Sequence, residues 1–249
     1  MKSTAILVLI LALGLNISIS QSKRNVLIVT AHPDDWEIVM GGTAYLLKDK
    51  YQIHVAIASR GERGFSKEPK SETAAIRTKE AECSAAKIGA KLNFLGKIDG
   101  DIYADSDAVK QLVTLMKTLD PAITFVMWPF DKPDHAAASN MAILALNKSG
   151  IAYDHEVYLF DGGHGSTSNH FIPDIYVNIT PVWLNKQEIV NCHAVHNKDS
   201  SLSKMVENEN KTYGYINRTP YAEGFKPLYP LTNGRWDSNK KIKCTLLDL

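Results

Sequence analysis

The residues best suited to chemistry stand near the N-terminus, where His32, Asp34 and Asp35 follow an apolar run at residues 26–29. A short β-branched run of this kind is typical of a buried strand. Open α/β sheets bind ligands at the carboxyl ends of their parallel strands, which is where these three side chains would lie. Together they can supply metal ligands and a proton acceptor. The alternative is a polar turn in which an aspartate caps the next helix.

A second polar group follows another apolar run, at residues 123–128. Its members are Asp131, Lys132, Asp134 and His135. Strand-end loops share one edge of a doubly wound sheet and the first strand is commonly central, so the two groups should meet. His32, Asp35 and His135 then form a set that suits Zn²⁺ and leaves a position for water, although the same set also suits Fe²⁺. Asp34 would be the base that takes a proton from that water.

Alternating strands and helices predict the sheet that these loops require. Strands are expected at residues 26–30, 53–59, 92–95 and 123–128, and helices at 41–50, 71–92, 107–119 and 136–147. This alternation indicates an α/β fold with a doubly wound, mostly parallel sheet and helices on both faces. Later strands are expected at 156–160 and 175–179, with a helix at 181–197. From residue 198 the polar, Gly/Pro/Asn-rich chain is expected to form a C-terminal cap over the sheet edge.

The composition argues against several classes of partner. The chain has 249 residues, of which 45% are hydrophobic and 22% charged, and its net charge is +1. These values are ordinary for a soluble globular protein. They do not favour nucleic acid or an anionic membrane surface as the main partner. A small-molecule or glycan substrate is instead what the candidate metal site and the family resemblance given below imply.

Residues 1–20 have the features of a secretory signal peptide. Lys2 precedes an apolar stretch at residues 5–15, and Ser18 and Ser20 provide small residues before a cleavage site expected near Ser20–Gln21. The apolar stretch is short for a stable membrane span, although an uncleaved anchor is the alternative. We therefore expect a secreted or periplasmic protein whose mature part, residues 21–249, forms one domain.

The cysteines do not suggest a metal site. Cys83, Cys192 and Cys244 are widely spaced and form no C-x-x-C motif, which disfavours a cysteine-bound zinc. One disulfide is possible in an oxidising compartment, and the favoured pair is Cys192–Cys244.

The first stretch resembles the signature of a known family. Ala31-His32-Pro33-Asp34-Asp35-Trp36-Glu37, followed by Gly41-Gly42-Thr43, is similar to the AHPDD-x-E…GGT motif of the GlcNAc-phosphatidylinositol de-N-acetylase (PIG-L, LmbE-like) family. Further agreement is found at residues 60–64, Arg77-x-x-Glu80, Phe94-Leu95-Gly96, Asp99-Gly100, Pro133-Asp134-His135, Lys186 with His193, and residues 221–225. The resemblance covers about residues 25–226, nearly the whole mature chain.

The resemblance implies a zinc-dependent hydrolase with a Rossmann-like fold that deacetylates N-acetylglucosamine-type sugars or related amides. It places zinc on His32, Asp35 and His135, with Asp34 as general base. Three further residues are candidates for substrate contacts, and two of them have an alternative role. Arg63 could bind an anionic group. Arg77 could instead pair with an acidic residue, and Asp99 could make an Asx-turn rather than contact a sugar hydroxyl.

Two motifs depart from the family pattern. The family has H-x-D-H in its second metal motif, and Lys132 occupies the position of the first histidine. Lys132 is therefore either the proton donor to the leaving group or a solvated surface lysine, and His164 could substitute for it. The family's H-x-S-Q tail is His193-Ala194-Val195-His196 here.

Two other functions stay open. The same metal centre could hydrolyse a different amide or an ester. The chain could also be a non-catalytic carbohydrate-binding protein that kept the fold. The sequence leaves the oligomeric state undetermined.

Overall fold

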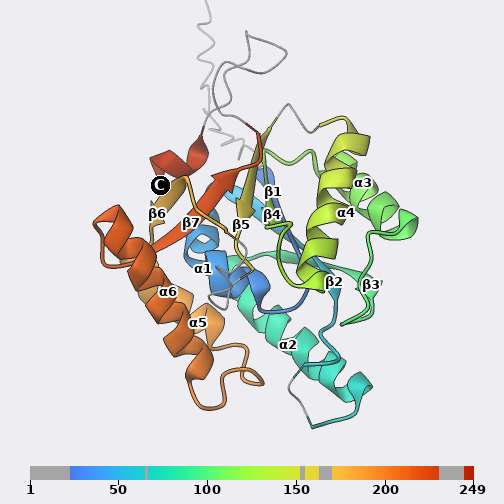
Figure 1. Ribbon diagram of the computed structural model, residues 1–249, viewed down its shortest axis with the longest axis horizontal. Helices are drawn as coiled ribbons and strands as arrows, with labels where there is room; N and C mark the ends of the chain where they lie inside the picture. The colour runs from blue at the N-terminus through green and yellow to red at the C-terminus, as the bar shows by residue number, and fades with distance from the viewer. Residues whose placement is uncertain (1–22, 65–66, 152–154, 163–169, 230–243) are drawn as a thin grey trace, which may run out of the picture.

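The computed structural model describes residues 23–64, 67–151, 155–162, 170–229 and 244–249 (Figure 1). Its centre is a seven-stranded sheet in the order β3-β2-β1-β4-β5-β7-β6. The strands are β1 (Arg24–Thr30), β2 (Tyr51–Ser59), β3 (Lys91–Lys97), β4 (Ile123–Met127), β5 (Glu156–Phe160), β6 (Ile175–Asn178) and β7 (Ala222–Pro227). The first five strands run parallel, and β7 runs antiparallel to both of its neighbours. The predicted mostly parallel sheet is confirmed.

The central strands are apolar because both faces of the sheet are covered. Residues 26–29 of β1 are fully buried, as is every residue of β4. Parallel strands buried on both sides have this continuous hydrophobic character. Strand β1 lies between β2 and β4, so the loops that follow β1 and β4 are neighbours at one edge of the sheet.

Helices cover both faces, as the alternation predicts. They are α1 (Asp35–Leu47), α2 (Lys70–Ile88), α3 (Ser106–Leu119), α4 (Pro133–Ser149), α5 (Trp183–Val190) and α6 (Ser201–Asn217), with 3-10 turns η2 (Thr180–Val182) and η3 (Thr245–Asp248). Helices α3 and α4 pack together on one face (Figure 1). Helix α5 packs against α1, α2 and α6 on the other face.

The Gly-Gly-Thr motif is explained by a kink in α1. The helix begins at Asp35, earlier than expected, and its backbone leaves helical geometry at Met40. The N–H groups of Gly42 and Thr43 donate to the Glu223 carboxylate of β7, at 2.8 and 2.6 Å. Lys186 also donates to Glu223, at 2.7 Å, and both side chains are fully buried. This ion pair satisfies backbone groups that the kink releases.

The C-terminal third of the chain has a different structure from the one predicted from the sequence. The helix predicted at residues 181–197 ends at Val190. The region expected only to cap the sheet supplies both α6 and β7, and β7 lies inside the sheet between β5 and β6. Strand β7 pairs with strands distant in sequence, so no local turn signals its place.

The disulfide prediction is wrong. Cys83 of α2 is bonded to Cys192, which follows α5, with their Cα atoms 5.8 Å apart. Cys244 is a free cysteine and accepts a hydrogen bond from the Tyr158 hydroxyl at 3.3 Å. The pairing depends on how α5 packs against α2, which cysteine spacing does not encode.

The predicted signal peptide, residues 1–20, lies outside the described residues. No helix within the described ranges combines the length and apolar character that crossing a bilayer requires.

Candidate metal centre

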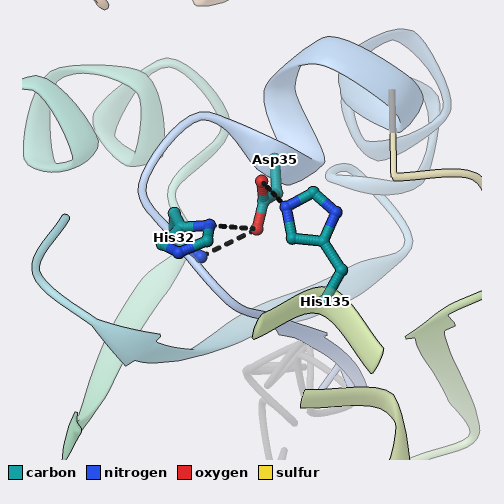
Figure 2. Close-up of side chains that lie close together, drawn as sticks. All are labelled: His32, Asp35 and His135. Atoms are coloured by element: carbon teal, nitrogen blue, oxygen red, sulfur yellow. Dashed lines mark hydrogen bonds and ion pairs between the residues drawn. The ribbon is translucent and has the colours of Figure 1, made fainter. Parts of the chain in front are cut away.

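His32, Asp35 and His135 converge at the carboxyl edge of the sheet, as Figure 2 shows. His32 Nδ1 lies 3.8 Å from Asp35 Oδ2, and His135 Nε2 lies 3.5 Å from Asp35 Oδ1. Each residue offers one ligand atom, and these atoms all lie within 4.8 Å of one another. The backbone N–H groups of Ala31 and His32 donate to Asp35 Oδ2 at 3.0 and 2.7 Å and so fix the carboxylate. Two imidazoles and one carboxylate could hold a metal ion here.

Carboxylates also bind the outer nitrogen of each imidazole. His135 Nδ1 lies 3.0 Å from Asp131 Oδ2. His32 Nε2 lies 3.0 Å from Asp99 Oδ1 and 3.1 Å from Asp134 Oδ2. Metal-binding histidines have this arrangement, with one nitrogen facing the metal and the other held by a carboxylate. His32, Asp99 and Asp134 also form a second possible ligand group on the opposite side of the same ring.

The charge balance of the site favours a cation. Burial alone would lower the pKa of His32, but hydrogen bonds to Asp134, Asp35 and Asp99 outweigh it and hold that pKa well above its usual value. Burial would raise the pKa of Asp35, but the charges of His135 and His32 lower it. The site is therefore rich in buried carboxylate. Nitrogen and oxygen ligands of this kind fit Zn²⁺.

Asp34 lies beside this group in a strained backbone conformation. Its φ of 98° is in the left-handed region, which is uncommon for a residue other than glycine. Its side chain is buried, and Oδ2 lies 3.0 Å from Arg77 Nη2 and 2.5 Å from His196 Nδ1. Burial would raise the pKa of Asp34, but Arg77 and His196 reverse that effect and lower it. Asp34 is therefore ionised and able to accept a proton.

Residues 27–146 match a family profile, PIG-L: GlcNAc-PI de-N-acetylase. The chain carries a PIG-L domain. A curated relative, 4-oxalmesaconate hydratase of Pseudomonas putida, is 28% identical over 192 residues, which cover 69% of this chain and 74% of the relative.

Solved structures share the fold of the PIG-L domain. The N,N'-diacetylchitobiose deacetylase from Pyrococcus horikoshii has a TM-score of 0.72 and 25% identity, covering 82% of this chain and 84% of that one. GalB, the 4-carboxy-2-hydroxymuconate hydratase from Pseudomonas putida KT2440, has a TM-score of 0.77 and 23% identity, covering 86% of this chain and 100% of that one. The family supports a metal-dependent deacetylase or hydrolase of the LmbE type, and hydratases also appear among the relatives.

The three predicted substrate residues differ in accessibility. Arg77 is buried, and besides Asp34 it donates to the carbonyl oxygens of Pro33 and Gly61. Asp99 is also buried, where it holds His32 and accepts the backbone N–H of Arg63 at 2.8 Å. Only the Arg63 side chain is exposed among these three. Arg77 and Asp99 therefore position other site residues, whereas Arg63 is open to solvent.

Of the two candidate proton donors of the sequence, Lys132 lies in the described part of the chain. Lys132 is exposed at the N-cap of α4, and its backbone N–H donates to Asp131 Oδ1 at 2.6 Å. His164 lies outside the described residues.

Three residues at the site had no predicted role. Asp134, which holds His32 Nε2, and Asp131 were recognised only as members of the polar group after residues 123–128. Asp131 precedes His135 by four residues, and this spacing within a loop and first helical turn was the available signal. His196 reaches Asp34 from the segment after α5, and its only signal was its place in the tail motif of the family. The PIG-L match ends at residue 146, well before His196.

Proposed function

We propose that the protein is a zinc-dependent N-deacetylase of an N-acetylglucosamine-type sugar or glycoconjugate. The observation that carries this proposal is the double set of contacts made by His32 and His135. Each ring directs one nitrogen toward Asp35 and the other toward an outer carboxylate. Such pre-oriented imidazoles suit a zinc site with an open position.

The residues around the metal position have different roles in the proposed reaction. A zinc ion held by His32, Asp35 and His135 would supply an acidified water and polarise the acyl carbonyl. Asp34 accepts a proton from the attacking water, since Arg77 keeps its carboxylate ionised. Asp34 can then return the proton to the departing amine nitrogen. Lys132, at the exposed start of α4, is the other candidate donor.

Exposed aromatic side chains beside the centre support a sugar substrate. Tyr103 is 66% exposed in the chain that follows β3, and Phe130 is 68% exposed in the loop after β4. A hydrogen bond to Asp101 and the charge of that carboxylate raise the pKa of Tyr103, and the charge of Asp134 adds a smaller effect. Flat rings with an apolar face are suited to packing against a pyranose. Arg63 at the same edge would meet an anionic substituent.

The hydratase relative favours a second candidate, the addition of water to an unsaturated substrate. Metal-activated water and the base Asp34 would serve that reaction equally well. Hydrolysis of another amide or ester, or carbohydrate binding without catalysis, are the remaining alternatives. Zinc-loaded protein should therefore be tested on N-acetyl sugars, O-acetyl sugars, acylated amino acids and 4-oxalmesaconate. The proposal is supported if acetate is released from the N-acetyl sugars and the other substrates are not converted.

The first prediction separates the base from the metal ligands. Asp34→Asn should keep zinc but lose at least about 100-fold in kcat, because an amide cannot accept the proton. His135→Ala should lose zinc itself, measured by atomic absorption. A chelator should stop acetate release by the wild type, and added zinc should restore it. Normal turnover by Asp34→Asn would contradict the assigned base.

A secreted or periplasmic location is part of the proposal. The Cys83–Cys192 disulfide supports it, because such bonds persist in oxidising compartments. Cell fractionation with N-terminal sequencing tests both the location and the cleavage expected near Ser20–Gln21.

A further inference from the structure

Residues 192–196, here called the histidine segment, connect the C-terminal end of α5 to the candidate centre. At its start, Cys192 is bonded to Cys83 of α2. Next, His193 is buried and its Nε2 lies 2.9 Å from Glu37 Oε1 of α1. Further along, the Val195 N–H donates to Glu80 Oε1 of α2 at 2.8 Å. The segment is therefore tied to two helices before it reaches Asp34.

His196, the last residue of the segment, contacts Asp34 on the same oxygen as Arg77. His196 Nδ1 lies 2.5 Å from Asp34 Oδ2, and Arg77 Nη2 lies 3.0 Å from that atom. The two donors come from different elements, so together they restrict rotation of the carboxylate about its Cβ–Cγ bond. Oδ1 is left as the oxygen that can take a proton.

Arg77 alone would fix the carboxylate less well. Its guanidinium is shared with the carbonyl oxygens of Pro33 and Gly61. The backbone of Asp34 is also strained, with φ at 98°, and such conformations persist only where surrounding contacts hold them. A second donor, on a segment anchored by a disulfide, meets that need. Reaction geometry must be held to within about 0.5 Å for full rate.

We propose that His196 is a positioning residue for Asp34, holding Oδ2 so that Oδ1 faces the attacking water. The proposal rests on the proposed function, because it assumes that Asp34 is the base. It adds a residue outside the PIG-L match and outside the predicted site. It requires only a hydrogen-bond donor at the position of Nδ1, not proton transfer by the imidazole.

The test compares three variants of the full-length protein. His196→Ala removes the donor, and His196→Asn places an amide N–H near the position of Nδ1. Lys198→Ala, an exposed change two residues later, is the matched control. The probe is acetate release from N,N'-diacetylchitobiose by zinc-loaded protein, with kcat and KM measured separately. Zinc content and Tm are measured for every variant.

We expect His196→Ala to lower kcat about 10- to 100-fold while KM stays within about twofold. His196→Asn should recover to within about fivefold of wild type, and Lys198→Ala should match wild type. Zinc content should be equal in all variants. A wild-type kcat in His196→Ala overturns the proposal. So does a His196→Asn protein that folds, binds zinc and is as slow as His196→Ala.

Failure of the proposed function can be distinguished from failure of the proposal for His196. If Asp34→Asn turns over normally, the base is wrong whatever the His196 variants do. A measurement without turnover keeps the contact itself testable. In protein carrying ¹⁵N-labelled histidine, the His196 ring signals should move in Asp34→Asn and stay in place in Lys198→Ala. Unchanged signals in Asp34→Asn overturn the contact and the proposal with it.

Discussion

The candidate ligand His135 depends on a neighbour in its own sequence. Asp131 follows β4, and its carboxylate oxygen Oδ2 lies 3.0 Å from His135 Nδ1. The contact fixes the ring so that Nε2 faces Asp35. Burial would raise the pKa of Asp131, but the hydrogen bond and charge of His135 lower it, so the carboxylate stays ionised. An ionised partner raises the basicity of the imidazole and its affinity for a metal.

Asp131→Asn should therefore weaken zinc binding by roughly 10- to 100-fold, because the amide no longer supplies charge and can hold the wrong tautomer. Competition with a chromophoric chelator measures the affinity. Asp107→Asn, at an exposed position of α3, is the control for removing one carboxylate. If both variants bind zinc as tightly as wild type, Asp131 does not orient the ligand.

Residue types and spacing predicted His32, Asp34, Asp35 and His135 because each stands at the end of a recognisable strand. They could not predict that His196 meets Asp34, since that contact spans 162 positions. It depends on how α5 packs against α1 and α2 and on the course of the segment that follows. The burial of Arg77 and Asp99 is likewise a property of packing, and it turns two expected substrate contacts into supports of the site.

At the scale of elements, α2 and α5 are joined by the Cys83–Cys192 disulfide, which closes a loop with a sequence separation of 109. A bond that closes so long a loop stabilises mainly by restricting the unfolded chain, by about 2 to 4 kcal/mol. It also anchors the histidine segment, four residues before His196. Loss of the bond should therefore affect both stability and the base.

Cys83→Ser/Cys192→Ser should lower Tm by roughly 5–15 °C and reduce kcat more than it raises KM. Thermal unfolding and the acetate-release assay measure the two effects. Cys244→Ser is the matched control, since that cysteine is not bridged. If the double variant and wild type have equal Tm and kcat, the disulfide neither stabilises the fold nor anchors the histidine segment.

The strands β1 to β5 were predictable because each is a short apolar run closed by a loop, and local sequence decides that pattern. Strand β7 was not, because the residues that precede Ala222 carry no hairpin signal and its partners are β5 and β6. The buried pair of Lys186 and Glu223 links this strand to the kink of α1. Lys186 and Glu223, which both belong to stretches that resemble the family, thus have a structural role on the face of the sheet covered by α5.

At the scale of the whole molecule, ionisable groups beneath α6 should make stability depend on pH. Glu209 of α6 is half-buried, and its Oε2 atom has no hydrogen-bond partner among the described residues. Burial, together with the negative charges of Asp161 and Glu223, raises its pKa to about 7, against the partial compensation of Lys186. Burial and Asp131 also raise the pKa of Asp161, to about 6.

The direction in which stability changes with pH depends on whether the folded or the unfolded state holds the proton on Glu209. Between the ordinary glutamate pKa of 4.5 and about 7, the folded protein keeps a proton on Glu209 that the unfolded chain has released. Stability must therefore fall as pH rises through this range. Glu209→Gln resembles the protonated acid at every pH. It should be more stable than wild type at pH 8 by about 1 to 3 kcal/mol, with little difference at pH 4.5.

Glu207→Gln, one half-turn earlier on the same helix, provides the contrast. The hydrogen bond and charge of Lys211 lower the pKa of Glu207, and the pair stands 2.7 Å apart at the surface. Removing that carboxylate should cost at most about 1 kcal/mol at pH 8 and gain nothing. Urea unfolding at pH 4.5, 6 and 8 measures all three proteins. If the stability of Glu209→Gln falls with pH as steeply as that of wild type, Glu209 is not the group that makes stability depend on pH.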